Sequence, residues 1–228
     1  DCIGLTVTAF NLAEKYQCPV IRLSDGSLAF STQSVPYPNQ EDFTIINRKR
    51  WEGDGEYRRY AMTDDFISPM ADPGTHGGMH IATGLEHNEA GLPNYAPDNH
   101  EAMQRKRFRK LDNVINDVAP VEIDTDDNEQ ADLGIIAWGS TIGVVREALQ
   151  RLRAEGFAVK GFYPKLLHPL PAEQFENFGA SCNRLLVPEV NYQGQLAHFI
   201  RAETGLKPES YTICGGLPFT PEMIVKKV

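Results

Sequence analysis

The sequence predicts an α/β protein whose later part is a parallel or mixed sheet with helices on both faces. Apolar residues make up 41% of the 228-residue chain, which is enough for a buried core. After residue 132, apolar runs of strand length alternate with segments of helical period, and such alternation is typical of parallel sheets. Before that point lies a stretch of about a hundred residues that is rich in proline and glycine and has poor periodicity, which predicts a long irregular arm.

The first predicted element is a helix over residues 5–16. Leu5, Leu12 and Tyr16 lie on one face at helical spacing, and Cys18-Pro19 ends the helix. Residues 20–23 then predict a short strand that closes at Ser24-Asp25-Gly26. Since the helix begins without a preceding strand and the first residue is not Met, we expect residues 1–31 to be the end of an upstream α/β domain in a larger enzyme.

Residues 32–132 predict an interdomain arm with one helix near residues 98–113. Asp98 or Asn99 can cap this helix, and its basic residues fall towards the C-terminal end, where the helix dipole favours them. The plain interpretation of the basic run at residues 105–110 is a solvated helix face. The acidic stretch at residues 122–132 then predicts a solvated linker.

Residues 133–228 predict an independent α/β domain. Its expected strands are residues 133–138, 157–162, 185–190 and 211–214. A helix from residue 142 to about 156 follows the first strand, Pro171 can begin another, and residues 193–204 form a third. The first strand is apolar throughout, which is typical of a strand covered on both faces.

Charge and cysteine content exclude several classes of protein. The net charge of −9 argues against nucleic acid, because binding phosphates requires an excess of Lys and Arg on one face. No window is apolar over the roughly 18 to 20 residues that span a bilayer. The four cysteines form no C-x-x-C pair, so we expect no metal cluster, and their small number suits a reducing cytoplasm.

Two segments offer candidate binding residues beside a helix. Ser140 and Thr141 stand between a strand and a helix, where backbone N–H groups can hold an anion; the alternative is an ordinary turn with a hydroxyl N-cap, because the P-loop lysine is missing. Asn191 and Gln195 follow the third strand of the last domain, at a sheet edge that lines the ligand crevice in open parallel sheets. The alternative for Asn191 is that it caps the following helix.

The stretch from residue 74 to 89 is the richest in polar chemistry. It contains His76, His80 and His87 with Glu86, which can bring an imidazole near a carboxylate for proton transfer or substrate orientation. The spacing is not H-E-x-x-H, which argues against a metal site. A substrate mouth and a glycine-rich loop that covers a neighbouring subunit are equally consistent with this composition, and no residue is assigned a catalytic role.

Several motifs, in this order, resemble the alpha subunit of 2-oxoacid:ferredoxin oxidoreductases, most closely the 2-oxoglutarate type. The motifs are Tyr57-Arg58-Arg59-Tyr60, Ile67-Ser68-Pro69 with Pro73-Gly74, Ala82-Thr83-Gly84-Leu85-Glu86-His87, Lys106-Arg107-Phe108-Arg109-Lys110-Leu111 and Glu189-Val190-Asn191-Tyr192-Gln193-Gly194-Gln195-Leu196. The resemblance runs through nearly the whole chain. Met70 and Phe66 depart from it, because close relatives are expected to carry Arg and Gly there.

The resemblance implies thiamine-diphosphate-dependent oxidative decarboxylation of 2-oxoglutarate or a related 2-oxoacid, with coenzyme A as cosubstrate and ferredoxin as electron acceptor. It implies that residues 133–228 are similar to a transketolase C-terminal domain and that residues 1–31 end a pyrimidine-binding domain. It places thiamine diphosphate, Mg²⁺ and a [4Fe-4S] cluster in the whole complex, largely on a beta subunit, with none bound by this chain alone. A cytoplasmic dimer of heterodimers is the expected assembly.

Two further hypotheses are open. The chain can be a non-catalytic module for dimerisation and assembly of such a complex, in which the last domain holds the dimer and the arm embraces a neighbour. A regulator that binds a small ligand or nucleotide rests only on the turn at Ser140 and Thr141.

Overall fold

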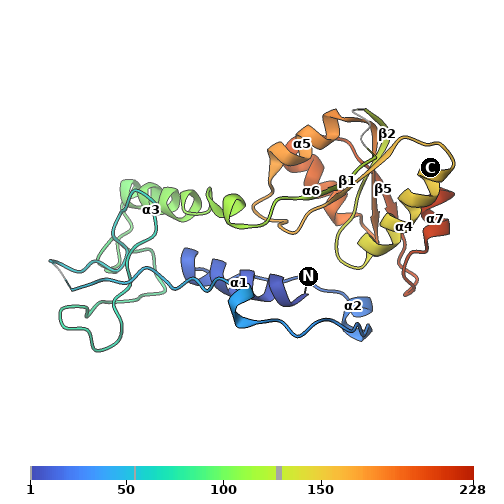
Figure 1. The fold of residues 1–228 in the computed structure, drawn as a ribbon. Coiled ribbons are helices and arrows are strands. Elements are labelled where there is room, and N and C mark those ends of the chain that lie inside the picture. Colours follow the sequence, from blue (N-terminus) through green and yellow to red (C-terminus); the bar gives the residue numbers. More distant parts are fainter. Residues whose placement is uncertain (1, 54, 127–129) are drawn as a thin grey trace. The chain divides into compact units, whose positions relative to one another are not determined.

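The computed structural model describes residues 2–53, 55–126 and 130–228 (Figure 1). The chain divides into two compact units. Unit 1 comprises residues 1–22 and 35–117, and unit 2 comprises residues 23–34 and 118–228. Within the described ranges, no helix combines the length and the apolar character needed to cross a membrane.

Unit 2 is built around a five-stranded sheet with the order β1-β3-β2-β4-β5. The strands are β1 (Glu122–Asp124), β2 (Ala131–Ile136), β3 (Val159–Tyr163), β4 (Cys182–Glu189) and β5 (Glu209–Thr212). β2 pairs in parallel with β3 and with β4, and β4 pairs in parallel with β5. Only the short edge strand β1 runs antiparallel, against β3. The sheet is therefore mixed and mostly parallel.

Helices cover both faces of this sheet (Figure 1). On one face lie α4 (Thr141–Ala154) and α7 (Pro221–Val225), and on the other lie α5 (Ala172–Ala180) and α6 (Gln195–Thr204). Alternate residues of β2 point to opposite faces: Ile135 packs in the cluster with α4, and Ile136 packs in the cluster with α5 and α6. The predicted α/β class and the helices on both faces are confirmed.

Two predictions for unit 2 are wrong in detail. The acidic stretch 122–132 was expected to be a solvated linker, but Glu122–Asp124 forms β1; residues 127–129 of that stretch lie outside the described residues. Arg153 donates to Asp124 Oδ1 at 2.7 Å, and Tyr163 donates to Asp124 Oδ2 at 3.1 Å, so tertiary contacts hold the acidic strand at the sheet edge. Helix α5 begins at Ala172, one residue later than the Pro171 expected as its first position.

Unit 1 has little regular structure beyond two helices, α1 (Cys2–Tyr16) and α3 (Pro97–Arg109). Two short 3-10 helices, Gln40–Asp42 and Val114–Asp117, complete it. Polar contacts tie its distant segments together: Tyr16 Oη donates to Asp117 at 2.5 Å, and Arg48 donates two hydrogen bonds to the Glu14 carboxylate. The irregular chain between α1 and α3 is thus held by specific side-chain contacts.

The structure corrects two predictions in the N-terminal half. Residues 20–23 form no strand: Ile21 is exposed, and the described residues provide no ladder partner for this segment. The short helix α2 (Gly26–Phe30) follows, capped by Asp25, whose side chain accepts from Leu28 N. Helix α3 begins with Pro97 at its first position and ends at Arg109, so neither Asp98 nor Asn99 is the cap and the helix is shorter than expected.

Candidate functional site

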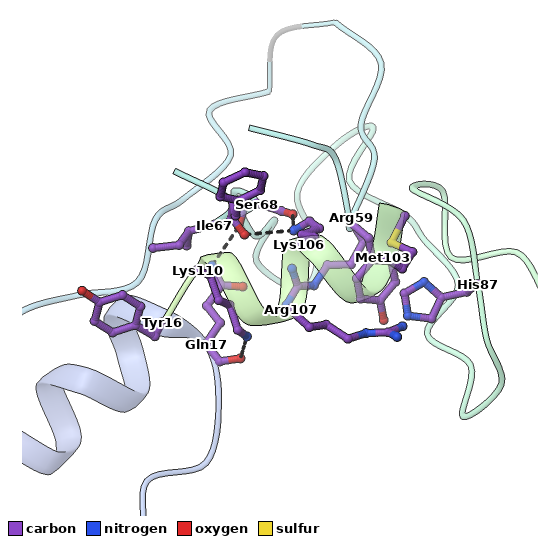
Figure 2. Close-up of a pocket in the computed structure, with 12 residues that line it drawn as sticks. Tyr16, Gln17, Arg59, Ile67, Ser68, His87, Met103, Lys106, Arg107 and Lys110 are labelled. Carbon is purple, nitrogen blue, oxygen red and sulfur yellow. Dashed lines mark hydrogen bonds between the residues drawn. The ribbon is translucent and has the colours of Figure 1, made fainter. Parts of the chain in front are cut away.

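The candidate site is a pocket of about 180 Å³ within unit 1 (Figure 2). Helix α3 and its C-cap provide four lining residues: Met103, Lys106, Arg107 and Lys110. Tyr16 and Gln17, at the end of α1, line it too. The irregular segment between the helices provides the others: Arg59, Tyr60, Phe66, Ile67, Ser68 and His87.

Lys106 is the most buried charged residue of this wall, with 9% of its surface exposed. Its Nζ donates to Ser68 Oγ at 2.5 Å and to the Phe66 carbonyl oxygen at 3.2 Å, and both acceptors are neutral. Burial, together with the positive charges of Lys110 and Arg59, lowers the pKa of Lys106 to about 8, although Asp65 and Glu89 act in the opposite direction. A lysine held in this way keeps its charge at neutral pH only against a desolvation cost.

The acceptor residue Phe66 has a positive φ of 58°, a backbone conformation that favours glycine. This explains in physical terms why a glycine was expected at this position. The ammonium group of Lys106 binds the Phe66 carbonyl oxygen, and Ser68 Oγ donates in turn to the Ala61 carbonyl oxygen. Lys106 therefore stabilises the strained turn and holds Phe66 and Ser68 in the lining of the pocket.

Arg107 has an ionic partner. It donates to Glu86 Oε1 at 2.8 Å and to Oε2 at 3.3 Å, and His100 Nδ1 lies 2.6 Å from Oε2. Arg107 first, and then His100, lower the pKa of Glu86 to about 2. Glu86 therefore stays ionised and anchors the loop to α3; in this arrangement it accepts hydrogen bonds and has no proton to give at neutral pH.

Arg59 and Lys110 complete the cationic wall. The Arg59 guanidinium lies 5.3 Å from the centre of the Tyr60 ring, and the His87 ring lies 3.9 Å from the same ring. Lys110 Nζ lies 3.5 Å from the Gln17 carbonyl oxygen, and burial lowers the pKa of Lys110. None of the described residues that line the pocket is Asp or Glu. The wall thus carries an excess of positive charge.

The structure separates the histidines of the predicted rich stretch. His87 lies at the pocket, and the neighbouring Glu86 binds the pocket residue Arg107. His80 is exposed and packs edge-on against Tyr57, with ring centres 5.4 Å apart, while His76 is exposed as well. No group of three or more His, Cys, Asp or Glu within the described ranges is placed to hold a metal ion.

The other predicted candidates lie in unit 2, at the carboxyl ends of the adjacent parallel strands β2 and β4. The Ser140 N–H donates to Asp25 Oδ2 at 3.1 Å, so a carboxylate of the chain itself occupies the backbone donor that was a candidate for anion binding. Thr141 Oγ1 donates to the Trp138 carbonyl oxygen at 2.7 Å, and Ser140 makes no capping hydrogen bond through its side chain. The expected hydroxyl N-cap is therefore wrong.

A buried carboxylate organises the turn after β4. Glu189 is 2% exposed and accepts from Leu196 N at 2.9 Å, from Ala197 N at 3.0 Å and from Asn191 Nδ2 at 2.8 Å. Glu189, rather than Asn191, thus satisfies the N-terminal N–H groups of α6. Asn191 Oδ1 instead accepts from Gln193 N and Gly194 N, and Gln195 is exposed at the start of the helix.

Sequence reasoning missed Arg59, Ser68, Lys106 and Lys110. The basic run was expected to be a solvated helix face, which is wrong for Lys106 and incomplete for Arg107 and Lys110. A signal was present: Met103, Lys106 and Lys110 recur at spacings of three and four, so they share the face that carries the apolar Met103. A lysine at helical spacing from an apolar residue is a candidate for burial.

Comparison with known proteins gives two family models that match separate parts of the chain. Residues 1–106 match the thiamine-diphosphate-binding model of pyruvate flavodoxin/ferredoxin oxidoreductases. Residues 131–224 match core domain II of pyruvate:ferredoxin oxidoreductase. Together the two models match residues 1–106 and 131–224, which include most of the irregular arm and the strands β2 to β5.

Individual relatives agree with these models. The alpha subunit of 2-oxoacid:ferredoxin oxidoreductase 2 from Aeropyrum pernix is 35% identical over 90% of this chain, and KorA, a subunit of 2-oxoglutarate oxidoreductase from Mycobacterium tuberculosis, is 32% identical over 98%. The chain spans 32% and 34% of their lengths, about one third of each.

A solved structure matches along the entire chain. It is the 2-oxoglutarate:ferredoxin oxidoreductase from Magnetococcus marinus with 2-oxoglutarate, coenzyme A and succinyl-CoA bound, and it is 64% identical with a TM-score of 0.96. The match covers 100% of this chain and 40% of that one. With two family models and alpha-subunit relatives in agreement, the chain belongs to the 2-oxoacid:ferredoxin oxidoreductase family and matches its alpha subunit.

Proposed function

We propose that the chain is part of a thiamine-diphosphate-dependent oxidoreductase that oxidatively decarboxylates 2-oxoglutarate, or a related 2-oxoacid, to the acyl-CoA and reduces ferredoxin. The observation that carries this proposal is the match along the whole chain, at 64% identity, to an enzyme with 2-oxoglutarate, coenzyme A and succinyl-CoA bound. The agreement in fold at a TM-score of 0.96 supports it, because side chains on a shared backbone can form the same kind of cavity.

Two cofactors of this reaction, Mg²⁺ and the iron–sulfur cluster, find no grouped ligands among the described residues. Magnesium prefers several oxygen ligands and an iron–sulfur cluster needs grouped thiolates, but among the described residues no such ligand group occurs and all four cysteines are free. The proposal places thiamine diphosphate, Mg²⁺ and [4Fe-4S] in the whole complex, held largely by a beta subunit. Coenzyme A is the cosubstrate, and ferredoxin receives the electrons through the complex.

Within that complex, the proposal assigns residues 1–31 to the end of a pyrimidine-binding domain, residues 32–132 to an interdomain arm and residues 133–228 to a transketolase C-terminal-like domain. The assembly is a cytoplasmic dimer of heterodimers. His76, His80, Glu86, His87, Asn191 and Gln195 are its candidates for a substrate mouth or a subunit contact. The Asp25 contact at Ser140 supports the plainer role of that turn as a structural link.

The test is turnover by the full-length alpha subunit with its beta partner. With 2-oxoglutarate and coenzyme A present, we expect reduction of ferredoxin or of a viologen dye, and we expect much slower turnover with pyruvate. Turnover with pyruvate but not 2-oxoglutarate would change the substrate assignment. Failure to reduce either acceptor with any 2-oxoacid would refute the proposal.

A non-catalytic assembly module is the second candidate. The observation that favours it is the exposure of large apolar side chains in unit 1, with Tyr37 93% and Met79 94% exposed. The exchanges His80→Ala and His87→Ala in the full complex distinguish the two functions, with His198→Ala, an exposed histidine outside the candidate set, as the control. Unchanged kinetics with weakened assembly would favour the module, whereas lost turnover with intact assembly would favour a site at the substrate.

A further inference from the structure

We propose that the cationic pocket of unit 1, formed around Arg59, Lys106, Arg107 and Lys110, binds an oxyanion: a phosphate or carboxylate group of a small molecule. The inference deepens the proposed function and rests on it: that function names His87 as a candidate for the substrate mouth but assigns no ligand chemistry to the pocket that His87 lines. Three properties of the described residues carry it: an excess of positive charge in the pocket lining, space, and available donors.

The first property is charge. Arg107 is neutralised by Glu86, but the groups that Lys106 and Lys110 contact are neutral oxygen atoms of Phe66, Ser68 and Gln17. Neutral acceptors orient an ammonium group without cancelling its charge. Because these cations are partly withdrawn from water, their mutual repulsion is screened less than at an open surface. An anion between them would relieve that repulsion.

The second property is space. The pocket volume of about 180 Å³ is far above the roughly 10–15 Å³ that one water molecule needs on this kind of measure. A phosphate or carboxylate group needs the volume of only a few waters. Polar and apolar atoms line the cavity together: Met103 and Ile67 lie beside the cations, so a ligand can carry an apolar portion next to its anionic group.

The third property is the availability of donors. An ammonium group has three N–H donors, and the protein acceptors found for Lys106 Nζ among the described residues are two, Phe66 O and Ser68 Oγ. The remaining proton can serve a ligand. Arg59 adds a guanidinium whose planar fork suits two oxygen atoms at once. Figure 2 shows the α3 cations and Arg59 around the same pocket.

An oxyanion fits this wall better than other ligand classes. A metal ion or an organic cation would meet four positive side chains, and the lining residues within the described ranges include no carboxylate to offset them. A purely apolar ligand would bury the two lysines without a counter-charge, which is costly. Phosphate and carboxylate share the chemistry that these donors recognise, and the experiment distinguishes their sources.

The experiment measures binding of inorganic phosphate to the full-length alpha subunit in its complex, from the rise in Tm with phosphate at constant ionic strength, with chloride as the reference salt. We expect Arg59→Gln and Lys110→Gln each to weaken phosphate binding about tenfold or more, because each removes a charge-assisted contact. Both side chains are only partly buried, so these variants should fold. Arg105→Gln is the matched control: it removes a charge from the same helix, but Arg105 is exposed and does not line the pocket.

Separate arms identify the source of the group. Coenzyme A, its 3′-dephospho form and 2-oxoglutarate replace inorganic phosphate in the same titration. The compound that binds the pocket is the one whose affinity falls in Arg59→Gln and Lys110→Gln but not in Arg105→Gln. Equal phosphate affinity in all four proteins, or a Tm rise no greater than that with chloride, would overturn the inference. Because turnover with 2-oxoglutarate is measured separately, failure of this inference is distinguishable from failure of the proposed function.

Discussion

The two units of the chain are stabilised by different interactions. Unit 2 has two buried apolar clusters, one on each face of its sheet, and its largest buried side chains interlock across strands and helices. Unit 1 buries few apolar residues, namely Leu12, Tyr16, Ile67, Ala71, Met103 and Val114. It relies on ion pairs and hydrogen bonds between distant segments, and it withdraws lysines from water. Burial of apolar side chains stabilises unit 2. In unit 1, the burial of Lys106 and Lys110 costs desolvation energy at the pocket where we propose that an anion binds.

The largest expected effect tests the core of unit 2. Leu149 of α4 is fully buried in the cluster between α4 and the sheet. Leu149→Ala should lower the free energy of unfolding of unit 2 by about 3–4 kcal/mol, because it removes apolar contacts and leaves a cavity. Hydrogen exchange on peptides from residues 131–224 measures this, with the exposed Leu217→Ala as control. An equal effect of both exchanges would contradict the assignment of the core.

A smaller effect is expected from the buried carboxylate of the same unit. Glu189→Ala leaves the N–H groups of Leu196 and Ala197 without their acceptor and should cost about 2–3 kcal/mol. Glu189→Gln keeps one amide oxygen as an acceptor and should cost less. Chemical denaturation of the two variants provides the comparison, and equal stability of both would show that the helix N-terminus does not need this oxygen.

The strained turn of unit 1 gives a prediction of about 1 kcal/mol. At Phe66, with φ of 58°, Phe66→Gly should be more stable than Phe66→Ala by about that amount, since alanine retains the left-handed strain. Inside helix α3 the order should be reversed, because alanine stabilises a helix more than glycine does. Ala102→Gly should therefore lower the free energy of unfolding by about 1 kcal/mol. Hydrogen exchange in residues 57–110 reports both differences. The same ranking at both positions would exclude strain at Phe66.

The pH dependence of unit 1 should reveal Lys106. Its pKa of about 8 in the folded protein is lower than its usual 10.5, so the unfolded chain binds more protons between these values. The free energy of unfolding should therefore rise with pH from about 8 upwards, by at most about 1.4 kcal/mol per pH unit. Lys106→Met should reduce this rise and leave the part that comes from the lowered pKa of Lys110, whereas Arg105→Gln should leave the rise unchanged. Denaturation curves at pH 7, 8 and 9 would show an unchanged rise in Lys106→Met if another group were responsible.

The sequence predicted unit 2 better than unit 1 for a physical reason. In unit 2, strands such as β2 are apolar throughout and helices such as α4 carry apolar residues at regular spacing, so burial alone determines the pattern. Strand ends differ from prediction by only a few residues. β1 was missed because its residues are acidic and their strand conformation depends on pairing with β3 and on Arg153.

The candidate site was only partly predictable. Glu86 and His87 were found because short-range composition marked their loop, but their roles depend on Arg107 and Tyr60, which are distant in sequence. Burial of Lys106 depends on Ser68 and Phe66, some forty residues earlier in the chain, where irregular backbone leaves no periodic signal. Residues 20–23 had the composition of a strand but lacked a pairing partner among the described residues.

The hydrogen bond from the Ser140 N–H to Asp25 ties the segment 23–34 to the domain that contains the sheet. A recombinant fragment that starts at residue 118 would lack Asp25 and the helix that it caps, although both belong to the same compact unit as the sheet. The entire span 35–117 separates this segment from the sheet in the sequence. Closing so long a loop is slow and entropically costly, so we expect the segment to join the sheet late during folding.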